Sequence, residues 1–375
     1  MTNSKQAPGI EGSTWVLKIG SSLVADGSGL SEHRLDTLCD QITELSRSGI
    51  NVVIVSSGSI SEGMHRLGLA QRPHDLPMLQ TAAAVGQMGL IHAYAKRFQE
   101  DGFSTGMVLL THDDLKDRER YLNARSTIET CLKHDVIPVI NENDSVSTEE
   151  IRFGDNDTLA ARVAALIQAD ALVVLTDQEG LCEADPRVRP NAKLIKRESP
   201  FNGSLEKMVN SEPGPYGRGG MLTKLEAARF AAKSGCDTWI VDGRQTDTLV
   251  RLLRGEEVGT HLTADITPVD ARKQWIAGQL RSRGELTIDE GAAQALVNNG
   301  VSLLPIGVKE VTGHFHRGDV VTVLDIEGNE IARGLSNYSD QEARAISGHA
   351  SSEIEGLLGY MDEPEMIHRD NLALI

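Results

Sequence analysis

The sequence predicts an α/β fold, a three-layer sandwich with a mainly parallel central sheet, followed by a small β-rich domain. Short apolar runs alternate with helix-like stretches over the first two thirds of the chain, which is typical of a parallel sheet with helices on both faces. Beyond about residue 275 the sequence pattern changes to short strand-like segments broken by glycines. A chain of 375 residues is also too long for one compact core, so we expect two or three domains.

The elements of the first domain are expected in strict alternation. The predicted strands are short apolar runs at 14–19, 51–56, 105–110, 136–140, 171–176 and 238–241. The helix-like stretches between them include 35–46, 79–100, 120–133 and 158–169. In such sheets ligands bind at the carboxyl ends of the strands, so the informative residues should follow the strands.

The β-rich segment is expected to form strands at 285–288, 301–304, 320–326 and 330–335, separated by Gly313, Gly318, Gly328 and Gly334. These patterns predict five parts of the chain. They are a disordered lead-in at 1–13, the first domain at 14–267, a linker at 268–283, the second domain at 284–362 and a tail at 363–375.

Composition excludes several classes of protein. The net charge of −17 makes general affinity for nucleic acid unfavourable. No apolar run approaches the ~20 residues that span a bilayer, and no leader-type apolar segment opens the chain, so we expect no membrane association. Four scattered cysteines without CxxC spacing predict reduced thiols and a cytoplasmic location: Cys39, Cys131, Cys182 and Cys236.

Two glycine turns that carry a lysine are the most informative feature. Residues 18–22 read Lys-Ile-Gly-Ser-Ser after the first predicted strand, and residues 217–224 read Gly-Arg-Gly-Gly-Met-Leu-Thr-Lys at a predicted helix start. Glycine amides and a helix N-terminus accept an anion, and two lysines from distant segments can clamp one phosphoryl group. Each turn alone is more often structural, but together they indicate a small-molecule kinase.

Polar clusters follow the other strands. Residues 56–59 read Ser-Ser-Gly-Ser, residues 141–144 read Asn-Glu-Asn-Asp, and residues 154–157 read Gly-Asp-Asn-Asp. Asp155 is also a suitable helix N-cap, whereas four polar residues directly after an apolar strand have no capping explanation. The fifth strand ends in Thr176-Asp177, followed by an Ala-Asp-Pro-Arg segment at 184–187.

In this order the motifs resemble the amino acid kinase family over about residues 14–265. Within it the chain is similar to the members that phosphorylate free L-glutamate at the start of proline synthesis. Residues from Gly284 to about Gly348 resemble a PUA domain. The resemblance implies ATP and Mg²⁺ as cofactors, γ-glutamyl phosphate as product, proline as feedback inhibitor, a homo-oligomer (dimer or tetramer) and association with glutamyl phosphate reductase.

The resemblance also implies roles at matching positions. Lys18 and Lys224 would neutralise the transferring phosphoryl group, with Asp157 orienting one or both lysines. Ser57, Asp144 and Asn156 would bind the amino-acid substrate. The nucleotide would contact Lys18, Thr176, Asp177, Arg218, Gly219, Gly220, Met221, Leu222, Thr223 and Lys224, and no residue is assigned as a metal ligand.

The chemistry of glutamate agrees with these roles. Its ammonium group needs an anionic partner such as Asp144, and an N-acylated substrate would leave that carboxylate unpaired at a cost of ~1–3 kcal/mol. The γ-carboxylate has an ordinary pKa of ~4.3 and is already ionised at neutral pH, so no general base is required. Repulsion between this anion and ATP is the remaining obstacle, which Mg²⁺ and the two lysines would offset.

Two departures from the family pattern bear on the nucleotide site. Arg218 stands where a small residue precedes Gly-Gly-Met, and Cys182-Glu183 replaces the more usual Tyr-Thr before Ala-Asp-Pro. Two other sequence motifs are weak evidence for a function. His368-Arg369-Asp370 is a chance match to a protein-kinase loop, and His314 with His316 lacks a third metal ligand.

Two alternatives remain beside this interpretation. Relatives of the second domain often bind RNA, which would suit an RNA-binding or RNA-modification protein. Residues 281–375, however, hold seven Lys and Arg against sixteen Asp and Glu, a net charge of −9, whereas a phosphate-binding face requires a basic patch. Within the kinases the alternatives are N-acetylglutamate kinase, aspartate kinase and uridylate kinase, and the cluster at 141–144 together with the second domain favours free glutamate.

Overall fold

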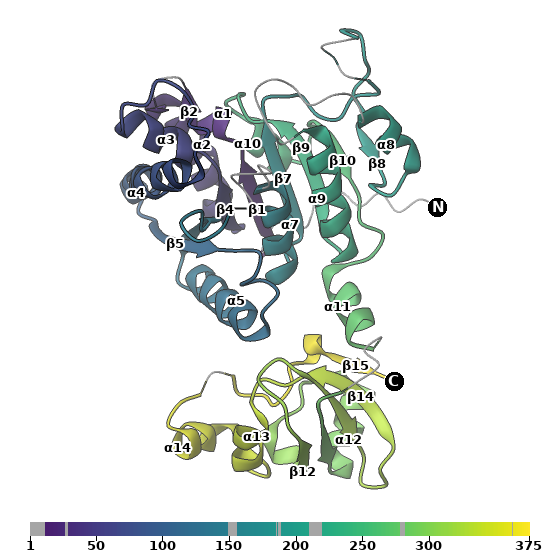
Figure 1. Ribbon diagram of the computed structural model, residues 1–375. Helices are drawn as coiled ribbons and strands as arrows, with labels where there is room; N and C mark the ends of the chain where they lie inside the picture. The colour runs from purple at the N-terminus through teal and green to yellow at the C-terminus, as the bar shows by residue number, and fades with distance from the viewer. Residues whose placement is uncertain are drawn as a thin grey trace. The chain divides into compact units, whose positions relative to one another are not determined.

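The computed structural model divides into two compact units, Met1–Pro268 and Val269–Ile375 (Figure 1). The structure describes residues 12–26, 29–148, 156–184, 186, 189–209, 220–277, 282–361 and 363–375. The expected lead-in at 1–13 therefore lies almost wholly outside the described residues. No helix in the described part of the chain is long and apolar enough to cross a membrane.

An eight-stranded sheet forms the centre of the first unit. Six neighbouring strands run parallel, and only the step from β9 to β10 is antiparallel, which confirms the predicted mainly parallel sheet. In spatial order the strands are β5 (Ser104–Leu110), β6 (Val136–Glu142), β4 (Asn51–Ser56), β1 (Thr14–Ile19), β7 (Ala171–Thr176), β9 (Asp237–Asp242), β10 (Thr260–Leu262) and β8 (Arg197–Glu198).

Strand β6 runs two residues further than predicted. Asn141 and Glu142 were expected in a loop, but they pair in register with Leu109 and Leu110 of β5. Since successive strand residues point to opposite faces, this pairing sends the Asn141 and Glu142 side chains to different sides of the sheet.

Helices cover both faces of this sheet, as the three-layer prediction requires (Figure 1). Along β1, Trp15, Leu17 and Ile19 pack in one core with α2 (Glu32–Arg47), α4 (Leu76–Glu100) and α10 (Thr248–Leu253). Val16 packs in the opposite core with α5 (Arg118–Lys133), α7 (Asn156–Leu166) and α9 (Met221–Lys233). Lys18 shares the parity of Val16, so it projects toward α7 and α9.

Helix α3 (Ser59–Arg66) packs against α4 at backbone contact. A Cβ atom added to Gly63 would lie 1.7 Å from the carbonyl oxygen of Ala82, and one added to Gly86 would lie 1.8 Å from that of Ser59. Only glycine permits this approach. The contact fixes α4 beside the carboxyl ends of β4 and β6. Shorter elements complete the unit: α1 (Ser21–Val24), β2 (Ala25–Asp26), β3 (Gly29–Leu30) and α8 (Gly203–Val209).

The second unit has its own sheet and its own apolar core. Helix α12 begins at Asp289, which caps it by accepting from Ala292 N, and α13 begins with a capping box between Ser339 and Glu342. The strand order is β12 (Val308–Gly313), β11 (Gly284–Ile288), β13 (Val320–Leu324), β14 (Glu330–Leu335) and β15 (Leu372–Leu374). Its helices are α11 (Pro268–Ala277), α12 (Glu290–Asn299), α13 (Asp340–Ile346) and α14 (Ile354–Leu358).

Several boundaries in this region differ from the sequence-based expectation. Residues 301–304 form no strand, only a bridge from Leu303 to Ile367, because Pro305 opens a 3₁₀ turn directly afterwards. The expected linker contains helix α11, and the expected tail supplies β15, which pairs with β14. Strand β12 was not predicted, because its sequence Val-Lys-Glu-Val-Thr-Gly is mostly polar.

The contact between α3 and α4 predicts that Gly86→Ala destabilises the first unit. The new methyl group must push the Ser59 carbonyl away, an overpacking penalty of about 1–3 kcal/mol. Urea unfolding should show a lower midpoint. The control is Gly203→Ala, since nothing lies within 4 Å of an added Cβ there. Equal midpoints for the two variants would contradict backbone contact at Gly86.

Candidate active site

A buried carboxylate bridges two lysines at the carboxyl end of the sheet. Asp157 lies in the first turn of α7, and its Oδ1 is 2.6 Å from Lys18 Nζ on β1. Its Oδ2 is 3.0 Å from Lys224 Nζ on α9. The structure thus brings together three residues that are distant in the chain and that the sequence predicted as a group.

All three side chains of this triad are nearly inaccessible to solvent, with Asp157 at 0% exposure. Burial would raise the pKa of Asp157, but the charges of Lys18 and Lys224 outweigh it and hold that pKa well below its usual range. Burial lowers the pKa of Lys224, although Asp157 counteracts it. With Asp157 ionised and both amines charged, the triad carries one net positive charge, which suits an anion.

The N-terminus of α9 adjoins the triad. Gly220 is the N-cap and provides no side-chain cap, so the first amides of the helix are available to a ligand. The Thr223 hydroxyl lies 2.9 Å from Asp157 Oδ2 and 2.8 Å from the Gly220 carbonyl oxygen. Met221, Leu222 and Thr223 are half-buried. This arrangement can hold phosphate oxygens beside the two lysines.

A second polar group lies at the ends of β4 and β6. Asn156 Nδ2 is 2.8 Å from Ser57 Oγ and 3.1 Å from Asn141 Oδ1. Asn141 Nδ2 donates in turn to Gln87 Oε1 at 2.8 Å. Asn156 immediately precedes Asp157, so this amide cluster and the lysine triad are joined through one helix turn.

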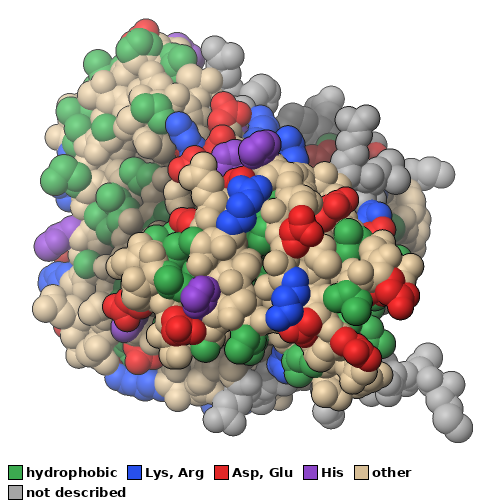
Figure 2. All heavy atoms as spheres, turned by 90° about the horizontal axis from the view of Figure 1, so that it is seen from below, with side chains coloured by type: hydrophobic (Ala, Val, Ile, Leu, Met, Phe, Trp, Pro, Cys, Tyr) green, Lys and Arg blue, Asp and Glu red, His purple; other side chains and the backbone are tan. Residues whose placement is uncertain are grey.

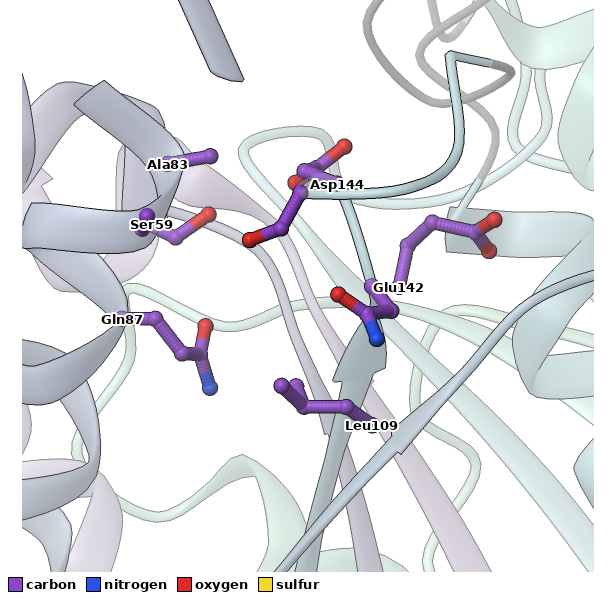
Figure 3. A pocket seen from close by; sticks show the side chains of 9 residues that line it. Ser59, Ala83, Gln87, Leu109, Glu142 and Asp144 are labelled. Atoms are coloured by element: carbon purple, nitrogen blue, oxygen red, sulfur yellow. The ribbon is translucent and has the colours of Figure 1, made fainter. Parts of the chain in front are cut away.

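A small cavity of about 20 Å³ lies next to the amide cluster. Figure 3 shows Ser59 from α3, Ala83 and Gln87 from α4, and Asp144 gathered around it. Asp144 is 4% exposed. The Glu142 carboxylate points away from Gln87 in this view. An anion at the wall of a polar cavity is a suitable partner for an ammonium group.

The opposite side of the triad offers a more open surface. Thr176 ends β7, and its hydroxyl lies 3.3 Å from an oxygen of the exposed Asp177. At the end of neighbouring β9, Arg244 makes two hydrogen bonds to the Asp242 carboxylate, at 2.9 and 2.7 Å. Cys182 is half-buried, and burial raises the pKa of its thiol.

Some predicted site residues lie outside the described residues, namely Arg218 and Gly219. The same holds for Asp155, Asp185 and Arg187. Within the described ranges no group of three or more His, Cys, Asp or Glu is arranged as a metal site. The four cysteines are all free.

Gln87 is the residue of this region that sequence reasoning missed. It lies 54 positions before its partner Asn141, in the middle of a long helix. No local pattern marks it. The neighbouring Gly86 was a possible signal, because a glycine inside a helix often marks a close backbone contact.

The triad predicts a characteristic pH dependence of stability. Because the pKa of Asp157 is depressed in the folded protein, its stabilising contribution is complete above pH ~4 and is lost as pH falls further. Asp157→Asn leaves two buried lysines facing each other, which costs about 3–5 kcal/mol. The difference in free energy of urea unfolding between parent and variant should be constant from pH 8 to 5 and should shrink below pH 4.

The control for this experiment is Asp113→Asn, since Asp113 is exposed and pairs only with Lys116 in the described structure. That change should have little effect at any pH. A difference for Asp157→Asn that already disappears between pH 7 and 5 would show that the carboxylate is not stabilised by the lysines.

Comparison with known proteins agrees with this geometry. Residues 13–242 match the family model described as the amino acid kinase family, and residues 284–358 match that of the PUA domain. The chain is 54% identical to the glutamate 5-kinase of Thioalkalivibrio sulfidiphilus, covering 100% of both chains. It is 55% identical to the glutamate 5-kinase of Methylococcus capsulatus, covering 96% of each.

Among solved structures, a carbamate kinase from Giardia lamblia bound to AMP-PNP shares the fold of the first unit. Its TM-score is 0.51 at 16% identity, covering 68% of this chain and 99% of that one. The chain therefore belongs to the amino acid kinase family, within its glutamate 5-kinase group, and carries a PUA domain in its C-terminal part.

Proposed function

We propose that the chain transfers the γ-phosphoryl group of ATP to the γ-carboxylate of L-glutamate. The product is γ-glutamyl phosphate, and the reaction is the first step of L-proline biosynthesis. Full-length relatives named glutamate 5-kinase support this substrate. The observation that carries the reaction type is the Lys18–Asp157–Lys224 triad beside a polar cavity.

The attacking group needs no general base. A carboxylate with an ordinary pKa of ~4.3 is ionised at neutral pH, so its oxygen can attack phosphorus directly. The barrier comes from bringing an anion to the polyanionic ATP. Catalysis then consists of positioning and charge neutralisation, as in other phosphoryl transfers.

Lys18 and Lys224 supply this neutralisation, one from β1 and one from α9. Asp157 holds both ammonium groups in place, 2.6 and 3.0 Å from its two oxygens. It is fully engaged by them and acts as an orienting group, not as a base. The uncapped first amides of α9 add donors for the phosphate oxygens.

Ser57, Asp144 and Asn156 bind glutamate in this proposal. Asp144 pairs with the substrate ammonium group, while the Ser57 hydroxyl and the Asn156 amide contact a carboxylate. The link between Asn156 Nδ2 and Ser57 Oγ keeps these two groups together before substrate arrives. The cavity of about 20 Å³ is far smaller than glutamate, so it represents the inner end of the site.

ATP lies on the other side of the triad, against Thr176, Asp177 and the segment from Arg218 to Lys224. The open surface at the ends of β7 and β9 supports this placement. The ATP phosphates would hold most of the Mg²⁺ coordination, as is usual in kinases. When bound, Mg²⁺ would supply neutralisation of phosphate charge.

The remaining parts of the proposal come from family membership. They are a cytoplasmic location, a dimeric or tetrameric assembly, inhibition by proline at the glutamate site, and association with glutamyl phosphate reductase. Proline resembles a cyclised glutamate and presents the same α-carboxylate. Because the acyl phosphate product is labile, association with the reductase that uses it would limit its loss.

The second unit serves activity or assembly in this proposal, and not RNA binding. Four of its basic residues already face carboxylates within 4 Å: Lys309 with Asp289, Arg333 with Glu330, Arg344 with Asp340 and Arg369 with Asp370. On the face shown in Figure 2, the described blue side chains lie among red ones and form no continuous basic surface. Such a surface is what a phosphate backbone requires.

The first functional test is the choice of acceptor. With ATP, Mg²⁺ and hydroxylamine, we expect hydroxamate from L-glutamate and none from N-acetylglutamate or aspartate, because only free glutamate offers both an ammonium group for Asp144 and a γ-carboxylate. Hydroxamate from one of the other two would assign the chain to a sister activity. No product from any acceptor would refute the proposed reaction.

The two halves of the site should separate kinetically. Asp144→Ala should raise KM for glutamate about tenfold or more with little change in KM for ATP, since a charged hydrogen bond is lost. Lys224→Ala should lower kcat about 10²–10³-fold, the usual effect of removing one electrostatic stabiliser. Steady-state kinetics with each substrate varied would test both. An unchanged KM for glutamate would remove Asp144 from the substrate site, and near-normal kcat would refute the two-lysine mechanism.

A further inference from the structure

We propose that Gln87 is a positioning residue for the glutamate site. Its amide oxygen accepts a hydrogen bond from Asn141, and Asn141 in turn accepts one from the Asn156 amide that contacts Ser57. This inference rests on the proposed function, because it adds a residue to the same substrate site.

Four side chains form a series of hydrogen bonds, three of them from helices or strands and one from a turn. Asn141 Nδ2 donates to Gln87 Oε1 at 2.8 Å. Asn156 Nδ2 then lies 3.1 Å from Asn141 Oδ1 and 2.8 Å from Ser57 Oγ. The series runs from α4 through β6 to α7 and ends at the turn after β4. The conformation of Asn156 therefore depends on Gln87, which acts through Asn141.

Asn141 has little freedom to adopt another arrangement. It is 1% exposed, and its Oδ1 accepts from both Asn156 Nδ2 and the backbone amide of Glu142. Without the Gln87 oxygen, the buried Asn141 NH₂ group would lose its acceptor, which is unfavourable away from water. Rotation of the Asn141 amide would turn its NH₂ group toward the Asn156 and Glu142 donors and would withdraw Oδ1 from both.

The position of Gln87 is fixed by the backbone. The preceding residue is Gly86, whose added Cβ would lie 1.8 Å from the Ser59 carbonyl oxygen and 2.4 Å from Gly63 N. Helix α4 is thus held at this point, and the Gln87 side chain starts from a rigid place.

The orientation of the Gln87 amide indicates which atom is used. Within the described structure, Gln87 Nε2 is buried and makes no hydrogen bond. In Figure 3 the Gln87 oxygen faces the side of Ser59 and Asp144, and its nitrogen is turned away from them. The side chain therefore acts through its acceptor oxygen.

The test is Gln87→Met, which keeps the length of the side chain and removes the acceptor. We expect KM for glutamate to rise about tenfold, KM for ATP to change less than about twofold, and kcat to change less than KM for glutamate. The matched control is Gln41→Met. Gln41 is also buried. Its side-chain amide makes hydrogen bonds to Leu249 N and to the Gln245 carbonyl oxygen, which lie in another part of the unit. The control should lower stability and leave KM for glutamate unchanged.

A double-mutant cycle with Asn141→Ala tests the coupling. Alanine removes both the donor that Gln87 accepts from and the acceptor that Asn156 uses, so adding Gln87→Met should then change KM for glutamate less than about twofold. The same tenfold rise in both backgrounds, or no rise in the parent background, would overturn the inference while glutamate kinase activity stood.

A further variant covers the case in which Gln87→Met does not fold. Gln87→Glu keeps an acceptor oxygen at the same place and should retain a KM for glutamate within about threefold of the parent. A tenfold rise in that variant would overturn the inference. A parent protein that does not phosphorylate glutamate would overturn the proposed function, and with it the assignment of Gln87 to a glutamate site.

Discussion

The pairing of one buried carboxylate with two buried amines is the interaction on which the site depends. Asp157 is fully enclosed, and a lone charge in such surroundings would be prohibitive. Lys18 and Lys224 make the ionised carboxylate tolerable, and Asp157 in turn favours the charged form of Lys224. Because β1, α7 and α9 contribute one group each, the ion pairs also join the sheet to two helices of one layer. The three charged groups are therefore already desolvated and oriented.

The amide cluster beside this triad follows from the same helix. Asn156 and Asp157 are consecutive, yet one contacts Ser57 and Asn141 while the other contacts the lysines. A helix N-terminus can do this because its first residues point in directions about 100° apart. The amide cluster and the lysine triad are thus held in fixed relation by one covalent step, an arrangement that suits the proposed in-line transfer.

Backbone contact between α3 and α4 limits the remaining freedom. Gly63 and Gly86 allow the two helices to approach until main-chain atoms touch. Such packing transmits strain and leaves little room for adjustment. Ala83 and Gln87, which line the cavity, lie on the helix that this contact holds in place. The second unit has an independent sheet and core and contains none of the residues proposed to act in catalysis.

Much of this was already determined by the sequence. The six parallel strands, the covering helices and the residues that follow each strand are encoded locally, in apolar runs and in polar turns, and they place Lys18, Asp157 and Lys224 at one edge of the sheet. Strands β12 and β15 were not readable from the sequence, because β12 is mostly polar and β15 is short, so only pairing with neighbours defines them. Tertiary structure alone decided the partner of each polar atom. Gln87 reaches Asn141 because of how α4 packs against α3. No local sequence pattern predicts a contact between residues that lie so far apart in the chain.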